Sequence, residues 1–135
     1  MSIIETVYGE RIAARLCDRI ADMDEATREY QTTGDALLDA QHAQQNVRDV
    51  LTRTEIHTRA ALLTDPDLGK NAEQRAANLT ERIAATPPIA RMREDLNEKQ
   101  WAVDYAERAH KNAYHQMESC RVAINGYAAV LGATH

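Results

Sequence analysis

The side chains with the clearest chemical potential are Glu107 and His110, which stand three residues apart in the run Glu-Arg-Ala-His. On a helix, this spacing matches the E-x-x-H unit with which di-iron helical bundles hold metal. Asp39 and His42 form a similar D-x-x-H unit in the first half of the chain. The two further inward glutamates that such a metal centre needs are not evident. We therefore assign no metal site, and we leave open whether the two units pair with each other or bind metal.

The sequence holds no pattern that is typical of catalysis. There is no G-x-S-x-G nucleophile turn and no glycine-rich phosphate loop ending in Gly-Lys-Ser/Thr. The two cysteines, Cys17 and Cys120, are too far apart to form a C-x-x-C pair, which favours a reducing compartment. We expect a protein that is not an enzyme, with no catalytic residues and no cofactor.

A binding site is predicted where a loop meets the start of a helix. Gly69, Lys70 and Asn71 precede that helix, and Arg75 lies one turn into it. The free N–H groups and the dipole of a helix N-terminus attract anions. Trp101 and Tyr105, four residues apart, form either a stacking surface for a base or a cover for a neighbouring helix. The predicted ligand-binding residues are Gly69, Lys70, Asn71, Arg75, Trp101 and Tyr105.

The distribution of charge supports the same region. The net charge of the whole chain is −5, which disfavours nucleic acid as the main ligand. Residues 48–93, however, hold eight basic and six acidic side chains. Their arginines either bind an anion or pair with the neighbouring acids on a solvated face. A second basic stripe, Arg11, Arg15 and Arg19, lies close to Asp18 and Asp22, which we expect to neutralise it.

Composition indicates that helices must position these residues. The 135 residues include no Phe, only 5 Gly and 3 Pro, which excludes a β-sandwich or barrel with frequent turns. No apolar run approaches the ~18 residues of a membrane span, and no signal peptide is evident. We expect one all-α domain, residues 1–135, in the cytoplasm.

The first helix is predicted over residues 3–63. Ser2 and Glu5 form a capping box at its start. The β-branched residues and the glycine of Thr32–Asp35 predict a kink or short break. Before that point the apolar stripe is Ile12, Leu16, Ile20 and Met23. After it, the predicted packing seam is Ala36, Ala40, Ala43, Val47, Val50, Thr54, His57 and Ala61, with Leu37 and Leu51 widening the buried face.

Two more helices are predicted after a turn at Thr64–Lys70. A short helix over 71–85 has Asn71 as its N-cap and turns Leu79 and Ile83 inward. A long helix over 87–132 follows, with Thr86 as its N-cap and Pro87 in its first position. Its seam keeps three-four spacing through Ile89, Met92, Leu96, Lys99, Val103, Ala106, His110, Ala113, Met117, Cys120, Ile124, Tyr127 and Leu131.

These helices predict a long antiparallel hairpin, coiled-coil-like, with a short connecting helix. If the chain turns back through the short helix, facing residue numbers sum to roughly 150. In that register Ala40 faces His110 and Ala43 faces Ala106. Two helices cannot enclose a core, whereas four can, so we expect a homodimer or a larger helical bundle.

The stretch from Thr64 to Thr134 resembles a family of small helical proteins encoded by phages and prophages. The residues that carry the resemblance are the run from Gly69 to Arg75, the proline at Pro87 and the long Ala/Glu-rich helix that follows. Here Thr86–Pro87–Pro88 replaces the acidic turn expected in that family. The family has no agreed biochemical role, so the resemblance implies a phage context and the cytoplasm of an infected bacterium.

Two functions fit these observations. The first is a non-enzymatic sponge that sequesters a small anionic nucleotide signal of host antiviral defence. The second is a structural or interaction accessory of phage replication, recombination or assembly that binds a protein or DNA partner.

Overall fold

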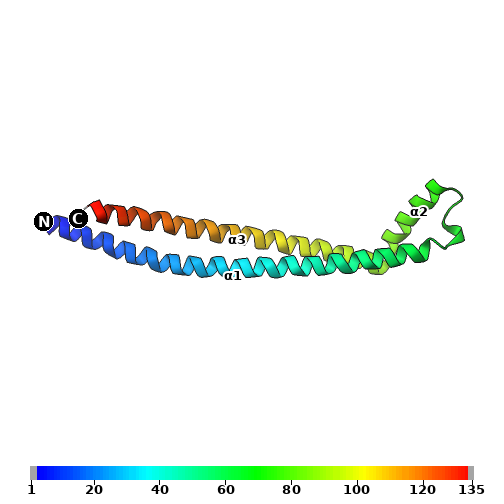
Figure 1. The fold of residues 1–135 in the computed structure, drawn as a ribbon, viewed down its shortest axis with the longest axis horizontal. Helices are drawn as coiled ribbons and strands as arrows, with labels where there is room; N and C mark the ends of the chain where they lie inside the picture. Colours follow the sequence, from blue (N-terminus) through cyan, green and yellow to red (C-terminus); the bar gives the residue numbers. More distant parts are fainter. Residues whose placement is uncertain (1–2, 134–135) are drawn as a thin grey trace. The chain divides into compact units, whose positions relative to one another are not determined.

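The computed structural model describes residues 3–133, which are almost entirely helical (Figure 1). The elements are α1 (Ile3–Leu62), the 3-10 turn η1 (Pro66–Leu68), α2 (Ala72–Ala85) and α3 (Pro87–Ala133). No strand occurs in this described range, so the prediction of an all-α fold in which a long helix packs against another is confirmed. The predicted capping box of Ser2 and Glu5 lies outside the side chains that the structure describes.

The chain divides into two compact units, to each of which α1 and α3 both contribute. Unit 1 contains the described residues up to 37 and from 106 onward, and unit 2 contains residues 38–105. In unit 1, Thr33 meets His110 while Tyr30 reaches Tyr114. In unit 2, Gln44 bonds Gln100 while Glu55 bonds Arg93. The helices are therefore antiparallel within each unit.

The predicted seam of α3 is confirmed. All thirteen of its positions are buried or half-buried, including the polar Lys99 and His110. Val103, Ala106, Ala113 and Cys120 are the most deeply covered members after Ile89. The three-four spacing is sufficient to identify this face because it holds one stripe of side chains against one partner helix over many turns.

The predicted buried face of α1 is partly wrong. Ile20 is 46% exposed, because two successive steps of four residues rotate it away from the stripe begun by Ile12. In unit 2 the predicted seam members Val50, His57 and Ala61 are exposed, whereas Leu51, predicted to widen the buried face, is buried as expected. A leucine removes more apolar area from water than the small residues beside it, so it sets the orientation of the helix.

The predicted break at Thr32–Asp35 is also wrong, since α1 continues through it. The Thr33 hydroxyl donates to the carbonyl oxygens of Glu29 and Tyr30, so this polar group is satisfied within the helix. Gly34 has a packing role, because a Cβ there would lie 3.2 Å from Cε1 of His110. These contacts offset the cost of placing one glycine within a helix. Whether the helix axis bends at this point is not tested by them, so the kink stays a prediction.

The core of unit 2 gathers where α2 and η1 meet the long helices. Leu79 and Ile83 of α2 are buried, as predicted. They pack with Leu51, Leu68 and Ile89, of which the last two are completely buried. Leu51 of α1 and Ile89 of α3 belong to the same cluster, so the two long helices of unit 2 pack together at this point.

The register agrees with the predicted sum of about 150 close to the turn, where Glu55 bonds Arg93 and their numbers sum to 148. At two other contacts the sum is smaller. Gln44 bonds Gln100, and Thr33 lies against His110, so the residue numbers sum to 144 and 143. The predicted pairing of Ala40 with His110 and of Ala43 with Ala106 is therefore wrong. Leu51 and Ile89, both predicted to lie on buried faces, share one apolar cluster, whereas the exact register depends on which side chains fit together between the two helices.

Candidate functional site

The loop before α2 is closed by local hydrogen bonds. The Asn71 side chain accepts the Gln74 N–H at 2.8 Å, which confirms Asn71 as the N-cap. The Gln74 side-chain oxygen accepts the Lys70 N–H at 3.3 Å. A Cβ at Gly69 would lie only 2.9 Å from the backbone nitrogen of Arg75, so the turn requires glycine. Gly69, Lys70, Asn71 and Arg75 are thus brought together as predicted.

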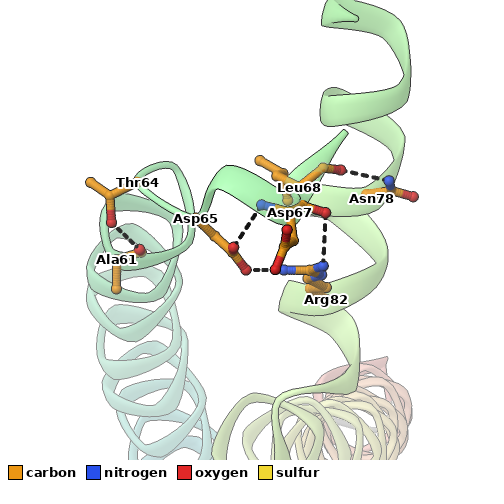
Figure 2. A network of polar contacts seen from close by, with 7 residues as sticks. All are labelled: Ala61, Thr64, Asp65, Asp67, Leu68, Asn78 and Arg82. Atoms are coloured by element: carbon orange, nitrogen blue, oxygen red, sulfur yellow. Dashed lines mark hydrogen bonds and ion pairs between the residues drawn. The ribbon is translucent and has the colours of Figure 1, made fainter. Parts of the chain in front are cut away.

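A polar network on the other side of this loop fixes η1 against α2 (Figure 2). The carboxylate of Asp65 accepts the Asp67 N–H at 2.9 Å and pairs with the guanidinium of Arg82. Arg82 also donates to the Asp67 carbonyl, and Asn78 donates to the Leu68 carbonyl at 2.6 Å. The bonds from Asp67 and Arg82 hold the pKa of Asp65 below its ordinary value, so this carboxylate keeps its charge to a lower pH than an ordinary aspartate does.

This network changes which cations of the basic region are free. Arg82 is engaged by Asp65, and Arg93 pairs with Glu55 at 3.1 Å. Lys70 and Arg75 are exposed, and no ion pair within residues 3–133 involves either of them. The predicted neutralised face and the predicted anion site therefore share the region. Lys70 and Arg75 are two of its six cations without an ion pair in the described residues, and they are the two beside the start of α2.

Trp101 and Tyr105 do not join this loop. They are 75% and 72% exposed on α3, so they do not act as a cover for α2. No hydrogen bond or ring contact in the described chain connects either ring with Gly69, Lys70, Asn71 or Arg75. Trp101 lies about four helical turns beyond Pro87, whereas Asn71 stands at the opposite end of α2. The six predicted ligand-binding residues thus form a loop cluster and a separate aromatic pair.

Thr86, the predicted N-cap of α3, caps that helix through its backbone alone. The Thr86 carbonyl accepts the Ala90 N–H at 3.0 Å, while its hydroxyl donates to the Arg82 carbonyl of α2. The side chain therefore ends α2 rather than starting α3. Thr86 is the one residue between α2 and α3, so it caps both the end of α2 and the start of α3.

His110 has different partners from those that the sequence suggested. Its ring stacks on Tyr30 with centroids 4.4 Å apart, and its Nδ1 lies 3.1 Å from the Thr33 hydroxyl. Glu107, the other half of the E-x-x-H unit, is exposed. Within residues 3–133, no group of three or more His, Cys, Asp or Glu side chains is placed to hold a metal ion. His110 is a packing residue of unit 1.

An open groove of about 620 Å³ in unit 1 was missed by the sequence reasoning. Ala26, Ala113 and Cys120 form its buried floor. Asp22, Glu25 and Glu29 of α1 stand on one side. The other side is α3, where a second stripe runs next to the buried seam, which we call the uncovered α3 stripe: Ala109, Asn112, Gln116, Ser119 and Ala123.

The uncovered α3 stripe has a signal in the sequence. Its spacings are three, four, three and four, and none of its members is charged. Asn112, Gln116 and Ser119 are exposed, and the two alanines are half-buried. Helix packing requires this spacing and small side chains at close approach, so the stripe could have been identified by reading a second seam beside the first.

Comparison of the chain with protein-family models, curated proteins and solved structures finds no significant match. In the part of the chain that the structure describes, no helix has a stretch apolar enough to cross a bilayer.

Proposed function

We propose that this chain is a non-enzymatic interaction module that packs another α-helix, from a second copy, against the open face of unit 1. The uncovered α3 stripe is the observation that supports it. In unit 1, α1 and α3 bury one stripe of side chains between them and leave this second one in solvent. A helix with two packing stripes is typical of a bundle of more than two helices.

The chemistry of the groove fits a helix better than a small molecule. Ala109, Ser119 and Ala123 have short side chains, which let another backbone approach closely. The groove is open along the helices, and its floor is made of apolar atoms from Ala26, Ala113 and Cys120. The resemblance to phage helical proteins suggests that such assembly serves phage replication, recombination or assembly in the cytoplasm of an infected bacterium.

Self-association gives the test of this proposal. We expect light scattering to show that the wild-type protein self-associates. Its melting temperature should rise with protein concentration, because each tenfold increase adds about 1.4 kcal/mol to the free energy of unfolding. Ala123→Glu places a charge on the stripe and should leave the protein monomeric. Ala129→Glu is the matched control, because Ala129 is exposed on α3 outside the groove. A wild type that stays monomeric and melts at one temperature over a hundredfold concentration range would contradict the proposal.

A second function is favoured by two of the unpaired cations of unit 2. Lys70 and Arg75 stand at the N-terminus of α2, where N–H groups and the helix dipole add to their positive charge. The alternative is a sponge that sequesters a small anionic nucleotide signal of host antiviral defence. In this function the loop holds the phosphate, and Trp101 and Tyr105 are the less direct members of the site.

Titration calorimetry with a cyclic dinucleotide tests the alternative. Lys70→Ala and Arg75→Ala should each weaken binding by about 1 to 3 kcal/mol, because each removes a charge-assisted hydrogen bond. The melting temperature should barely change, since exposed cations contribute little to stability. Arg53→Ala, an exposed arginine on α1 of the same unit, is the control. Full affinity in the double variant would place the ligand elsewhere.

A further inference from the structure

A series of six charged residues of α1 in unit 1 has its basic members before its acidic ones. Arg11, Arg15 and Arg19 come first, and Asp22, Glu25 and Glu29 follow. All six side chains are exposed. Arg19 and the three acids border the groove, and Arg15 borders an adjoining hollow beside Tyr127. Glu10 and Asp18 precede two of the arginines, and Arg28 precedes Glu29. Of these three, Asp18 borders the same hollow as Arg15.

Most of these charges have no partner within the chain. Arg19 pairs with Asp22 at 3.4 Å, in the middle of the series. No ion pair in residues 3–133 involves the outer members Arg11, Arg15, Glu25 and Glu29. The like charges of Arg11 and Arg15, and of Glu25 and Glu29, repel each other at a spacing of four residues. A partner that places acidic groups beside the arginines and basic groups beside the glutamates would therefore be attracted to both ends of this face.

The middle of the charge series lies beside the smallest part of the uncovered α3 stripe. Arg19 shares a hollow with Ser119 and Ala123. Gly126 continues the stripe by a further step of three residues. A two-fold axis at this level would place small residues of two α3 helices opposite each other, and these permit close contact.

We propose that a second copy of this chain docks antiparallel across the groove of unit 1, with the two-fold axis near Arg19 and Asp22 of α1. This inference rests on the proposed function and adds its orientation and register. Arg11 then faces Glu29 of the second copy, and Arg15 faces Glu25 of the second copy. Each pair occurs twice, because a two-fold interface is self-complementary.

The order of charges selects this orientation. In an antiparallel pair centred near residue 20, basic residues meet acidic ones at both ends of the face. In a parallel pair at the same level, Arg11 and Arg15 would meet their own copies, and so would Glu25 and Glu29. Complementary charges fix orientation and exclude the repulsive alternative, even where their contribution to affinity is modest.

Charge reversal tests the proposed pairs directly. Variant one carries Arg11→Glu and Arg15→Glu, and variant two carries Glu25→Arg and Glu29→Arg. Each by itself places like charges opposite each other, so its self-association should weaken at least ~100-fold. A one-to-one mixture restores opposite charges at all four pairs and should form a heterodimer close to wild-type affinity. Sedimentation equilibrium of each variant and of the mixture measures these three affinities.

The control for variant one is Arg28→Glu with Arg108→Glu, which changes the charge equally at exposed positions outside the groove. It should associate like the wild type. Circular dichroism verifies that all the variants are helical. Variants that dimerise like the wild type, or a mixture that stays monomeric, would overturn the antiparallel pairing while the Ala123→Glu result keeps the proposed function standing. A monomeric wild type would overturn both.

Discussion

Replacing Ile89 with alanine is expected to destabilise unit 2 by about 2 to 5 kcal/mol. Ile89 is completely buried and packs among Leu51, Leu68 and Ile83, where the first turn of α3 meets α1, η1 and α2. Removing its outer carbons leaves a cavity that these neighbours from three other elements cannot all close. The loss therefore includes both the transfer of apolar atoms to water and the empty space that remains.

Ile56→Ala is the matched control, since Ile56 lies in the same unit but is 61% exposed. It should change the free energy of unfolding by no more than about 0.5 kcal/mol. Urea unfolding followed by circular dichroism measures both variants. Equal effects of the two substitutions would mean that the cluster around Ile89 does not hold unit 2 together.

Replacing Gly69 with alanine is expected to cost about 1 to 3 kcal/mol. The added Cβ would lie 2.9 Å from the Arg75 backbone nitrogen, which belongs to the first turn of α2 and cannot move without disturbing it. The neighbouring Leu68 is completely buried, so a shift of the loop would also disturb the core. The effect reaches α2 through the backbone and involves no lost side-chain contact.

Gly9→Ala gives the opposite sign. Gly9 lies within α1, and a Cβ added there would meet no side chain or neighbouring element within 4 Å. Alanine should therefore stabilise the helix by about 0.5 to 1 kcal/mol. Thermal melts of the two variants would separate a glycine required by its surroundings from one that is only tolerated. A stabilising effect of Gly69→Ala would show that the loop can open away from Arg75.

Local patterns were sufficient for the helices and for the N-cap of α2. The seam from Ile89 to Leu131 is buried as its spacing predicted, because a regular three-four repeat leaves one face for one partner. Asn71 caps α2, α1 ends at Leu62 just before the predicted turn, and Gly69 ends η1, because these features depend on the residue itself and its near neighbours. The members of the loop cluster are neighbours in sequence, so their proximity was predictable too.

The tertiary structure alone decided the contacts between residues far apart in the sequence. The predicted seam from Ala36 to Ala61 repeats regularly, and Leu51 beside it is buried as predicted, yet Val50, His57 and Ala61 of that seam are exposed. Likewise, His110 lies against Tyr30 and Thr33 rather than against Ala40. Periodicity determines which residues share a face of one helix, but burial of the largest side chains decides where two helices meet and which faces stay open.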